Sequence, residues 1–379
     1  MRAVLRIVQL GVLLDPQRSP SQMMVDWWPL VDTAEMVAAA GAQVTVIQAS
    51  RVAQTQRPRD VTYHFVVPDA GSTLCASDGF ARLLRQLAPD VIHVHGLGFP
   101  REVIDLAELV PTTPILLQDH ADGVPRIWRR RLRRKGLAAA GGVSFCALSQ
   151  AEPFIRARML DARTQLFEIP ECSSRFTPGD QESARRVTGV FGDPAVLWVG
   201  HLNANKDPLT VLDGISRVLE HLPDLQLWCC FAQGPLLGEV QRKLAADSRL
   251  RDKVHLLGKV PHERIELMMR ATDLFVLGSH REGSGFSVIE ALACGLPPVI
   301  TRIPSFQALT ALGEVGALWN CDDATALGDA LLTVARQPRG EARAAARQHF
   351  DQELSFDAVG RKFLAAYKDL RSGIPPLAR

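Results

Sequence analysis

Arg281-Glu282-Gly283-Ser284-Gly285-Phe286-Ser287-Val288-Ile289-Glu290-Ala291-Leu292-Ala293-Cys294-Gly295-Leu296-Pro297-Pro298-Val299 is the stretch that decides the fold of the second half of this chain. It predicts a glycine-rich turn, a short apolar helix and the start of a buried strand. Glu290 is the only charged residue between Phe286 and Leu296. A helix that is apolar all round is buried, and a lone carboxylate on it loses its hydration unless hydrogen-bond donors meet it. The stretch therefore predicts a buried carboxylate that needs a polar partner.

The turn before this helix has the features of an anion site. Gly283 and Gly285, on either side of Ser284, let the backbone approach a ligand closely. Phe286 and Ser287 open the helix, and its first turn presents N–H groups and a positive dipole end to a phosphate. Ribose hydroxyl groups are suitable donors for the carboxylate of the helix. The local chemistry thus indicates nucleotide recognition.

Short apolar runs alternate with amphipathic stretches through the first half of the chain. Helices are expected at residues 29–40, ended by Gly41, and at 79–88, ended by Pro89. Strands that alternate with helices predict a parallel, doubly wound sheet. The buried strands are expected at residues 5–10, 43–47, 91–94, 115–117, 143–148 and 165–169.

The same alternation restarts after a polar passage rich in turn residues. We predict an N-terminal domain over residues 1–178, a linker over 179–194, a C-terminal domain over 195–350, and a C-terminal helix in 351–379 that packs back on the N-terminal domain. The fold class is α/β, with two facing doubly wound Rossmann-like domains. Because open α/β sheets bind ligands at the carboxyl ends of their strands, we expect an inter-domain cleft. The strands of the second half are expected at residues 196–199, 225–231, 254–257, 274–277, 298–301 and 317–319.

Composition limits the classes of function. A length of 379 residues suits two domains, and the net charge of +2 gives no support to a nucleic-acid partner. The seven cysteines include no C-x-x-C pair and several lie in apolar runs, so we interpret them as buried hydrophobic residues of a cytoplasmic protein. Residues 1–14 are interpreted as a strand rather than a signal peptide, because Arg6 interrupts the apolar run. No uncharged apolar run approaches the roughly 20 residues of a membrane span.

Four blocks of sequence, taken in order, resemble one family: the retaining nucleotide-sugar glycosyltransferases of the glycogen-synthase and sucrose-synthase-like class, family four, which have the two-Rossmann GT-B fold. The resemblance covers nearly all of the chain and is strongest over residues 197–319. Glu282 and Glu290 reproduce the family's two glutamates with seven residues between them. Residues 199–208 look like the loop that holds the donor diphosphate. The two remaining blocks, which look like loops beside the nucleotide, are Gln233-Gly234-Pro235-Leu236 and Leu257-Gly258-Lys259-Val260.

The resemblance implies roles for individual residues in the second half. Lys206 is expected to pair with the diphosphate and neutralise the leaving group, Glu282 to contact the donor sugar and Glu290 to hold the ribose. His201 stands where the family usually has arginine, so this phosphate contact becomes titratable. The expected donor-binding set also includes Gly234, Val260, Gly283, Ser284, Gly285, Phe286 and Ser287.

The first half offers one further candidate. Gln118-Asp119-His120 follows a predicted strand and looks like the family's cleft histidine, which would place His120 near the sugar and the acceptor as a catalytic residue. His93 and His95, by contrast, are expected to serve the packing and the end of their strand.

The resemblance also implies the reaction. It predicts metal-independent, retaining transfer of a sugar from a nucleoside-diphosphate sugar to a saccharide or lipid-linked acceptor, with no cofactor. The chain contains no Asp-x-Asp pair, the metal-holding feature of the other main glycosyltransferase architecture. Two alternatives stay open. One is a nucleotide-sugar epimerase of the same fold, and the other is a non-catalytic subunit that binds the donor.

A basic segment at residues 126–135 carries seven Arg and Lys residues, with Ile127, Trp128 and Leu132 between them. Such a segment suits the surface of an anionic membrane, an acidic acceptor such as a lipid phosphate, or a solvated helix face. The first of these would make the protein peripheral to the inner face of the membrane.

Overall fold

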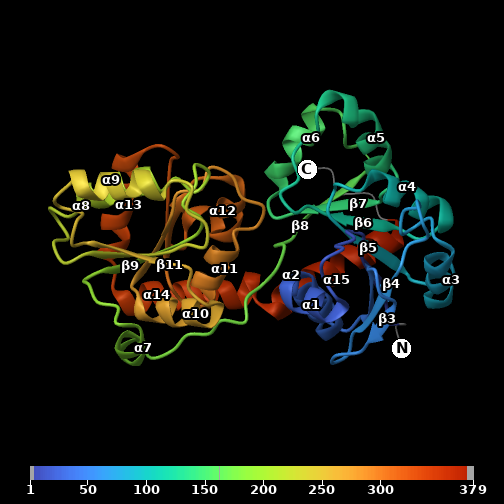
Figure 1. The fold of residues 1–379 in the computed structure, drawn as a ribbon, viewed down its shortest axis with the longest axis horizontal. Helices are drawn as coiled ribbons and strands as arrows, with labels where there is room; N and C mark the ends of the chain where they lie inside the picture. Colours follow the sequence, from blue (N-terminus) through green and yellow to red (C-terminus); the bar gives the residue numbers. More distant parts are fainter. Residues whose placement is uncertain (1–3, 162, 374–379) are drawn as a thin grey trace. The chain divides into compact units, whose positions relative to one another are not determined.

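The computed structural model of the chain describes residues 4–161 and 163–373. The chain divides into two compact units (Figure 1), Met1–Cys172 with Phe356–Arg379 and Ser173–Ser355. Each unit is a mainly parallel sheet with helices on its faces, so the predicted α/β class with two Rossmann-like domains is confirmed. None of the helices in the described residues has both the length and the apolar character needed to span a bilayer.

The sheet of the first unit has the order β3-β4-β2-β1-β5-β6-β7-β8, and every strand except β3 is parallel to its neighbours. The order reverses between β1 and β5, which are paired in the middle of the sheet. The strands are β1 (Arg6–Gly11), β2 (Gln43–Ala49), β3 (Gln54–Gln56), β4 (Thr62–Val66), β5 (Val91–His95), β6 (Ile115–Gln118), β7 (Gly142–Phe145) and β8 (Gln165–Glu168).

Helices bury both faces of this sheet. One core includes Phe80, Leu106 and Leu137 of the helices α3, α4 and α5. The other includes Met36 of α2 and Phe363 of α15. The helices are α1 (Pro20–Asp26), α2 (Trp28–Ala39), α3 (Asp78–Leu87), α4 (Pro100–Leu109), α5 (Ile127–Ala138), α6 (Glu152–Arg156) and α15 (Phe356–Ser372), with a 3-10 turn at Leu148–Ala151.

The last helix returns to the first unit, where Figure 1 shows the red α15 among blue and teal elements. It packs closely on α2, since a Cβ added at Gly360 would lie 2.4 Å from the carbonyl oxygen of Met36. α15 begins at Phe356 rather than at the expected residue 351, because Phe350–Leu354 forms a π-helical turn at the end of α14.

The sheet of the second unit has six parallel strands in the order β11-β10-β9-β12-β13-β14. α8 packs against α13, and α11 packs against α14. The strands are β9 (Ala195–Val199), β10 (Gln226–Cys230), β11 (Val254–Gly258), β12 (Leu274–Leu277), β13 (Pro298–Thr301) and β14 (Ala317–Trp319). The helices are α7 (Gln181–Thr188), α8 (Pro208–Val218), α9 (Leu237–Ala246), α10 (His262–Ala271), α11 (Phe286–Ala293), α12 (Pro304–Leu309), α13 (Ala324–Ala335) and α14 (Arg339–His349).

Residues 179–194 differ from the predicted linker, because they contain α7 and belong to the second unit. The carboxylate of Asp180 caps this helix by accepting a hydrogen bond from the N–H of Ser183, and Gly189 ends it with φ at 75°. α7 packs on α10, and its Arg185 lies 2.9 Å from Asp273. Turn residues on both sides of a short amphipathic helix made the whole passage look like a linker.

Candidate functional site

The two central strands of the second unit position most of the predicted site residues. The strand order reverses between β9 and β12, and in open α/β sheets the loops that leave such neighbouring strands diverge and form a crevice. The loop over residues 200–207 follows β9, and the loop over 278–285 follows β12. Both loops therefore lie at the same edge of the sheet.

Asn205 ties these two loops together. Its side-chain amide donates to the carbonyl oxygen of Arg281 at 2.9 Å and accepts from the N–H of Arg281 at 3.1 Å. Its own carbonyl oxygen accepts from the N–H of His280. Gly278 permits this approach, because an added Cβ would lie 3.1 Å from the carbonyl oxygens of Lys206 and Asp207. Sequence reasoning did not identify Asn205, since its partners lie 76 residues away.

Lys206 and Glu282 form an ion pair between the two loops. The ammonium nitrogen lies 2.5 Å from Oε1 of Glu282, and the side chains are only 16% and 14% exposed. Salt screens a pair this well covered much less than it screens a surface pair. The structure thus brings together the two residues that were expected to meet the diphosphate and the donor sugar.

The glycine-rich turn contains a residue in a conformation that favours glycine. Gly285 has φ at 73°, a left-handed conformation, and an added Cβ would lie 2.7 Å from the ring of Phe306. Buried Ser284 Oγ and His201 Nδ1 have no hydrogen-bond partner among the described residues. Buried polar atoms are normally paired, so two such atoms on these loops suit a site for a polar ligand.

Glu290 lies on α11 and is 7% exposed, as the sequence predicts. Its Oε1 lies 2.6 Å from Nε2 of His262, the first residue of α10, so the protein itself supplies one donor to this carboxylate. The hydrogen bond to Glu290 raises the pKa of His262, against the effect of partial burial. Sequence reasoning missed His262, whose only signal was its place two residues after Val260.

Gly234 and Val260 follow β10 and β11, which continue the sheet beyond β9. Backbone hydrogen bonds of 2.8 Å from Leu202 N to Gln233 O and from Leu236 N to Leu202 O join the loop after β10 to the loop after β9. Every donor-binding residue predicted in the second half therefore lies in the segments that follow four neighbouring parallel strands.

A group of metal-type ligands stands at the same edge. Nε2 of His280 lies 3.4 Å from Oδ2 of Asp207 and 3.8 Å from Oδ1 of Asp322. The side chain of Asp322 is 79% exposed. The three ligand atoms lie within 4.8 Å of one another, but exposed acidic groups of this kind commonly gather without an ion, so we assign no metal site here.

His120 lies in the first unit, directly beyond β6, and is held by two neighbours. Its Nδ1 is hydrogen bonded to the carboxylate of Glu171, and its Nε2 lies 3.3 Å from Nδ1 of His95. His95 was expected to serve its strand end, and the structure adds this contact with the candidate catalytic residue. Burial raises the pKa of the neighbouring Asp119 to about 7, and the charge of Asp122 contributes in the same direction.

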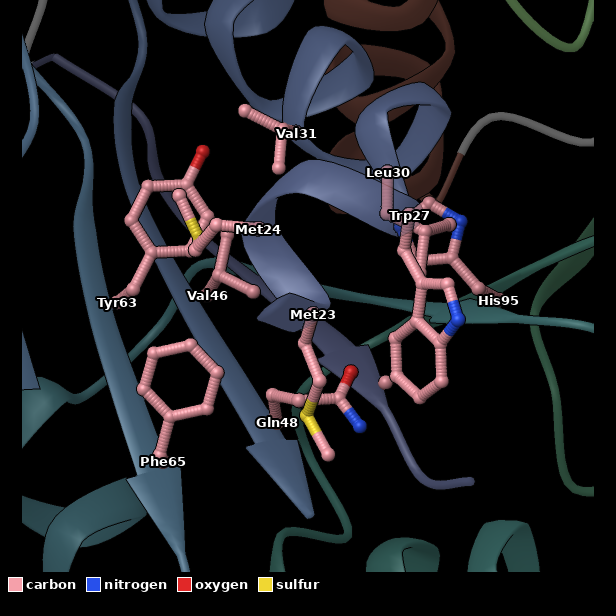
Figure 2. Close-up of a pocket in the computed structure, with 11 residues that line it drawn as sticks. Met23, Met24, Trp27, Leu30, Val31, Val46, Gln48, Tyr63, Phe65 and His95 are labelled. Atoms are coloured by element: carbon pink, nitrogen blue, oxygen red, sulfur yellow. The ribbon is translucent and has the colours of Figure 1, made fainter. Parts of the chain in front are cut away.

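Two hollows of the first unit differ in what they can hold. The cavity of about 30 Å³ in Figure 2 is lined mainly by apolar side chains such as Met23, Trp27 and Phe65, and is only large enough for about one water molecule. A groove of about 440 Å³ lies at the carboxyl ends of β1, β2 and β4. Its lining includes Leu14 and Arg51, and it is large enough for a sugar ring.

Several curated proteins are similar to this chain in sequence. GDP-mannose:cellobiosyl-diphosphopolyprenol alpha-mannosyltransferase of Xanthomonas campestris is 23% identical over 260 residues, 66% of either chain. D-inositol 3-phosphate glycosyltransferase of Corynebacterium urealyticum is 32% identical over 166 residues, which cover 41% of this chain and 39% of that protein. These matches span less than two thirds of either relative.

Solved structures show the fold, and a family model matches much of the second unit. Sucrose-phosphate synthase from Thermosynechococcus elongatus aligns with a TM-score of 0.67 at 19% identity, over 97% of this chain and 99% of that one. A glycosyltransferase from Rickettsia africae aligns with a TM-score of 0.71 at 15% identity, over 97% and 98%. The model of the family "Glycosyl transferases group 1" matches residues 180–350. The chain thus has the predicted GT-B fold, and residues 180–350 of its second unit match the model of the group 1 glycosyl transferases.

Proposed function

We propose that this protein is a retaining, metal-independent glycosyltransferase that moves a sugar from a nucleoside-diphosphate sugar to an acceptor. The observation that carries the proposal is the covered Lys206–Glu282 pair, which joins the loops after β9 and β12. A lysine, a carboxylate and the N-terminus of α11 at one sheet edge suit a diphosphate that is attached to a sugar.

Lys206 is the proposed stabiliser of the leaving group. Departure of a nucleoside diphosphate concentrates negative charge on its phosphate oxygens. A positioned ammonium group and the N-terminal end of α11 stabilise that charge without needing to reorganise during the reaction. His201 adds a second phosphate contact when its ring is protonated. No metal ion is required for this stabilisation.

The remaining residues of the site are proposed to fix the donor. Glu290 binds the ribose hydroxyl groups, with His262 holding its carboxylate in place. The segments around Gly234 and Val260 lie beside the nucleotide. Glu282 contacts the donor sugar while its charge is neutralised by Lys206. A carboxylate paired in this way is a poor covalent nucleophile, so retention is proposed to follow front-face attack, with the departing phosphate helping to deprotonate the acceptor.

The acceptor is proposed to bind mainly to the first unit and to be lipid-linked. Leu14 and Val67 line its 440 Å³ groove and are 41% and 45% exposed, which suits an acceptor with an apolar part. On α5, Ile127 and Trp128 are 74% and 68% exposed between arginines. Exposed apolar residues among basic ones suit the surface of an anionic membrane. The name of the Xanthomonas campestris relative likewise describes a diphosphopolyprenol-linked acceptor.

Two experiments test the proposal. In a thermal-shift panel of nucleoside diphosphates and their sugars, a ligand at 100 times its dissociation constant adds about 2.7 kcal/mol to the free energy of unfolding. The donor selected in this way is then supplied radiolabelled, with a panel of lipid-linked and free saccharides. Transfer to an acceptor supports the proposal, whereas an epimerised donor identifies an epimerase. Binding with neither product identifies a non-catalytic donor-binding subunit.

A further inference from the structure

A line of hydrogen-bonding groups runs through the interior of the first unit. The carboxylate of Glu171 meets Nδ1 of His120, and Nε2 of His120 lies 3.3 Å from Nδ1 of His95. Nε2 of His95 lies 3.4 Å from Oε1 of Gln9, which is fully buried. The two imidazole rings thus stand in series between two oxygen acceptors.

With the Gln9 amide oriented so that Oε1 faces His95, the number of ring protons follows from this order. Glu171 only accepts when it is ionised, so Nδ1 of His120 carries a proton, and Nε2 of His95 carries one to donate to Oε1 of Gln9. The contact between the rings needs a third proton, because without it two lone pairs would face each other across 3.3 Å. Two neutral imidazoles have only two ring protons.

We infer that His120 and His95 share three ring protons, so that the pair carries one positive charge beside Glu171. His120 then serves the transfer as a fixed cation rather than as a general base. Glu171 and His95 are then positioning residues. The role in transfer rests on the proposed function, whereas the protonation state does not.

The surrounding charges favour the cationic pair. Glu171 has a side chain that is only 12% exposed, and a covered carboxylate is costly without a positive partner. Asp119 and Asp122 add negative charge on the same side, and Arg133 lies 3.7 Å from Asp122 rather than beside Glu171. Among the residues that the structure describes, His120 is the basic side chain recorded in contact with Glu171, and an imidazolium there supplies the positive charge.

Burial opposes a charge on either ring, and the neighbouring charges decide which ring holds it. Burial opposes the charging of His120, but its hydrogen bond to Glu171 and the charges of Glu171, Asp119 and Asp122 outweigh it and raise the pKa of His120. Burial and the charges of His93 and His120 hold the pKa of His95 well below its usual range. Burial, with the charge of His120, also lowers the pKa of His93 to about 3. The charge therefore lies on His120.

The arrangement limits what His120 can do. An imidazolium has no lone pair with which to accept a proton, so His120 cannot deprotonate the acceptor. Both of its N–H groups are already engaged, with Glu171 and with His95, so it can stabilise negative charge only through its own positive charge. Because its pKa is raised, this capacity is complete at low pH and is lost as the pH rises through the pKa of His120.

Nitrogen NMR of the complete protein labelled with ¹⁵N-histidine tests the protonation state, with His120→Gln used to assign the signals. At pH 7, both ring nitrogens of His120 should carry protons, and His95 should be protonated at Nε2. Glu171→Gln should raise the acid dissociation constant of His120 about tenfold or more, because the opposite charge is removed. Glu108→Gln, which removes an exposed carboxylate of α4, should leave it unchanged.

A neutral His120 at pH 7, with His95 protonated at Nδ1, would overturn the inference, since that is the arrangement in which Gln9 turns and donates its amide. If Glu171→Gln does not fold, Glu171→Asp is the second variant: it keeps the negative charge, so the pKa of His120 should stay raised. The wild-type spectrum decides the protonation state in either case.

The transfer role has its own readout. In wild type, kcat should fall as the pH rises through the pKa that NMR gives for His120, and in Glu171→Gln the fall should move to lower pH by the same interval. If kcat falls at the same pH in wild type and in Glu171→Gln, His120 does not take part in the reaction. Absence of any transfer would refute the proposed function and, with it, the transfer role, while NMR would still judge the protonation state.

Discussion

The ammonium nitrogen of Lys206 lies 2.5 Å from Oε1 of Glu282, although 76 residues separate them in the chain. The contact exists because β9 and β12 are neighbours in the sheet, so the loops that follow them leave the same edge. Each side chain neutralises the other in a covered position. A ligand that contacts one of these side chains therefore also changes the environment of the other. For this reason Lys206→Ala and Glu282→Gln should have different effects.

Lys206→Ala should weaken the binding of nucleoside diphosphate and lower turnover. The ammonium group meets the bound diphosphate and, more strongly, the charge that develops as the sugar departs. Loss of one preorganised group of this kind lowers kcat by about 100- to 1,000-fold. Calorimetry and initial rates measure the two effects, and unchanged turnover would exclude this role. Lys253→Ala, which removes an ammonium group bonded to the carbonyl oxygen of Pro223, is the control.

Glu282→Gln should lower kcat while nucleoside diphosphate binds at least as tightly as in wild type. The substitution removes a contact to the donor sugar and also frees Lys206 from its counter-charge, which strengthens the attraction of Lys206 for phosphate. Calorimetry with the nucleoside diphosphate alone measures the stronger attraction for phosphate without the lost contact to the donor sugar. Weaker binding in Glu282→Gln would mean that Glu282 contacts the nucleotide rather than the sugar.

Glu290→Gln should weaken the binding of nucleoside diphosphate, because an amide oxygen is a weaker acceptor for ribose hydroxyl groups than a carboxylate. A hydrogen bond to a charged group contributes about 1.5–3 kcal/mol, so the dissociation constant should rise about 10- to 100-fold. The corresponding 2′,3′-dideoxy diphosphate is the matched ligand control, since its affinity should not change. If wild type and Glu290→Gln bind the ribose-containing diphosphate equally well, Glu290 does not bind the ribose.

The His262–Glu290 pair should make stability depend on pH. The hydrogen bond to Glu290 raises the pKa of His262, so the stabilisation is complete below the unfolded-state pKa and is lost as the pH rises through the folded-state pKa. The imidazole is 55% exposed, and solvent limits the effect to less than about 1 kcal/mol. Denaturant unfolding from pH 5.5 to 8.5 should show this loss in wild type and its absence in His262→Gln. Parallel curves for the two proteins would contradict the prediction.

The exposed face of α5 should bind vesicles that contain anionic lipid. Changing Arg129, Arg131 and Arg134 to Gln should release the protein, since each basic residue near such a surface contributes about 1 kcal/mol. Added salt should weaken the binding of wild type. The matched control changes three other exposed arginines of the first unit, Arg82, Arg85 and Arg101. Equal binding to neutral vesicles, or release by the control as well, would leave only a solvated helix face.

Much of the fold could be predicted from the sequence because buried parallel strands are short apolar runs with helices between them. The strands predicted at residues 274–277, 298–301 and 317–319 have the same bounds as β12, β13 and β14. β3 and β4 were not predicted, since β3 is largely exposed and β4 alternates between buried and half-buried residues at the edge of its sheet. The short helix α7 was masked by the turn residues around it.

The sequence by itself determined where the glycine-rich turn lies, that Glu290 is buried, and which loops follow which strands, because these features depend on neighbours within a few residues. Only the tertiary structure decided that Lys206 meets Glu282, that Glu290 meets His262 and that His120 stands between Glu171 and His95. Those contacts join residues between 25 and 76 positions apart. Strand order brings them together, and strand order is set by the packing of the whole sheet, which no local pattern of residues encodes.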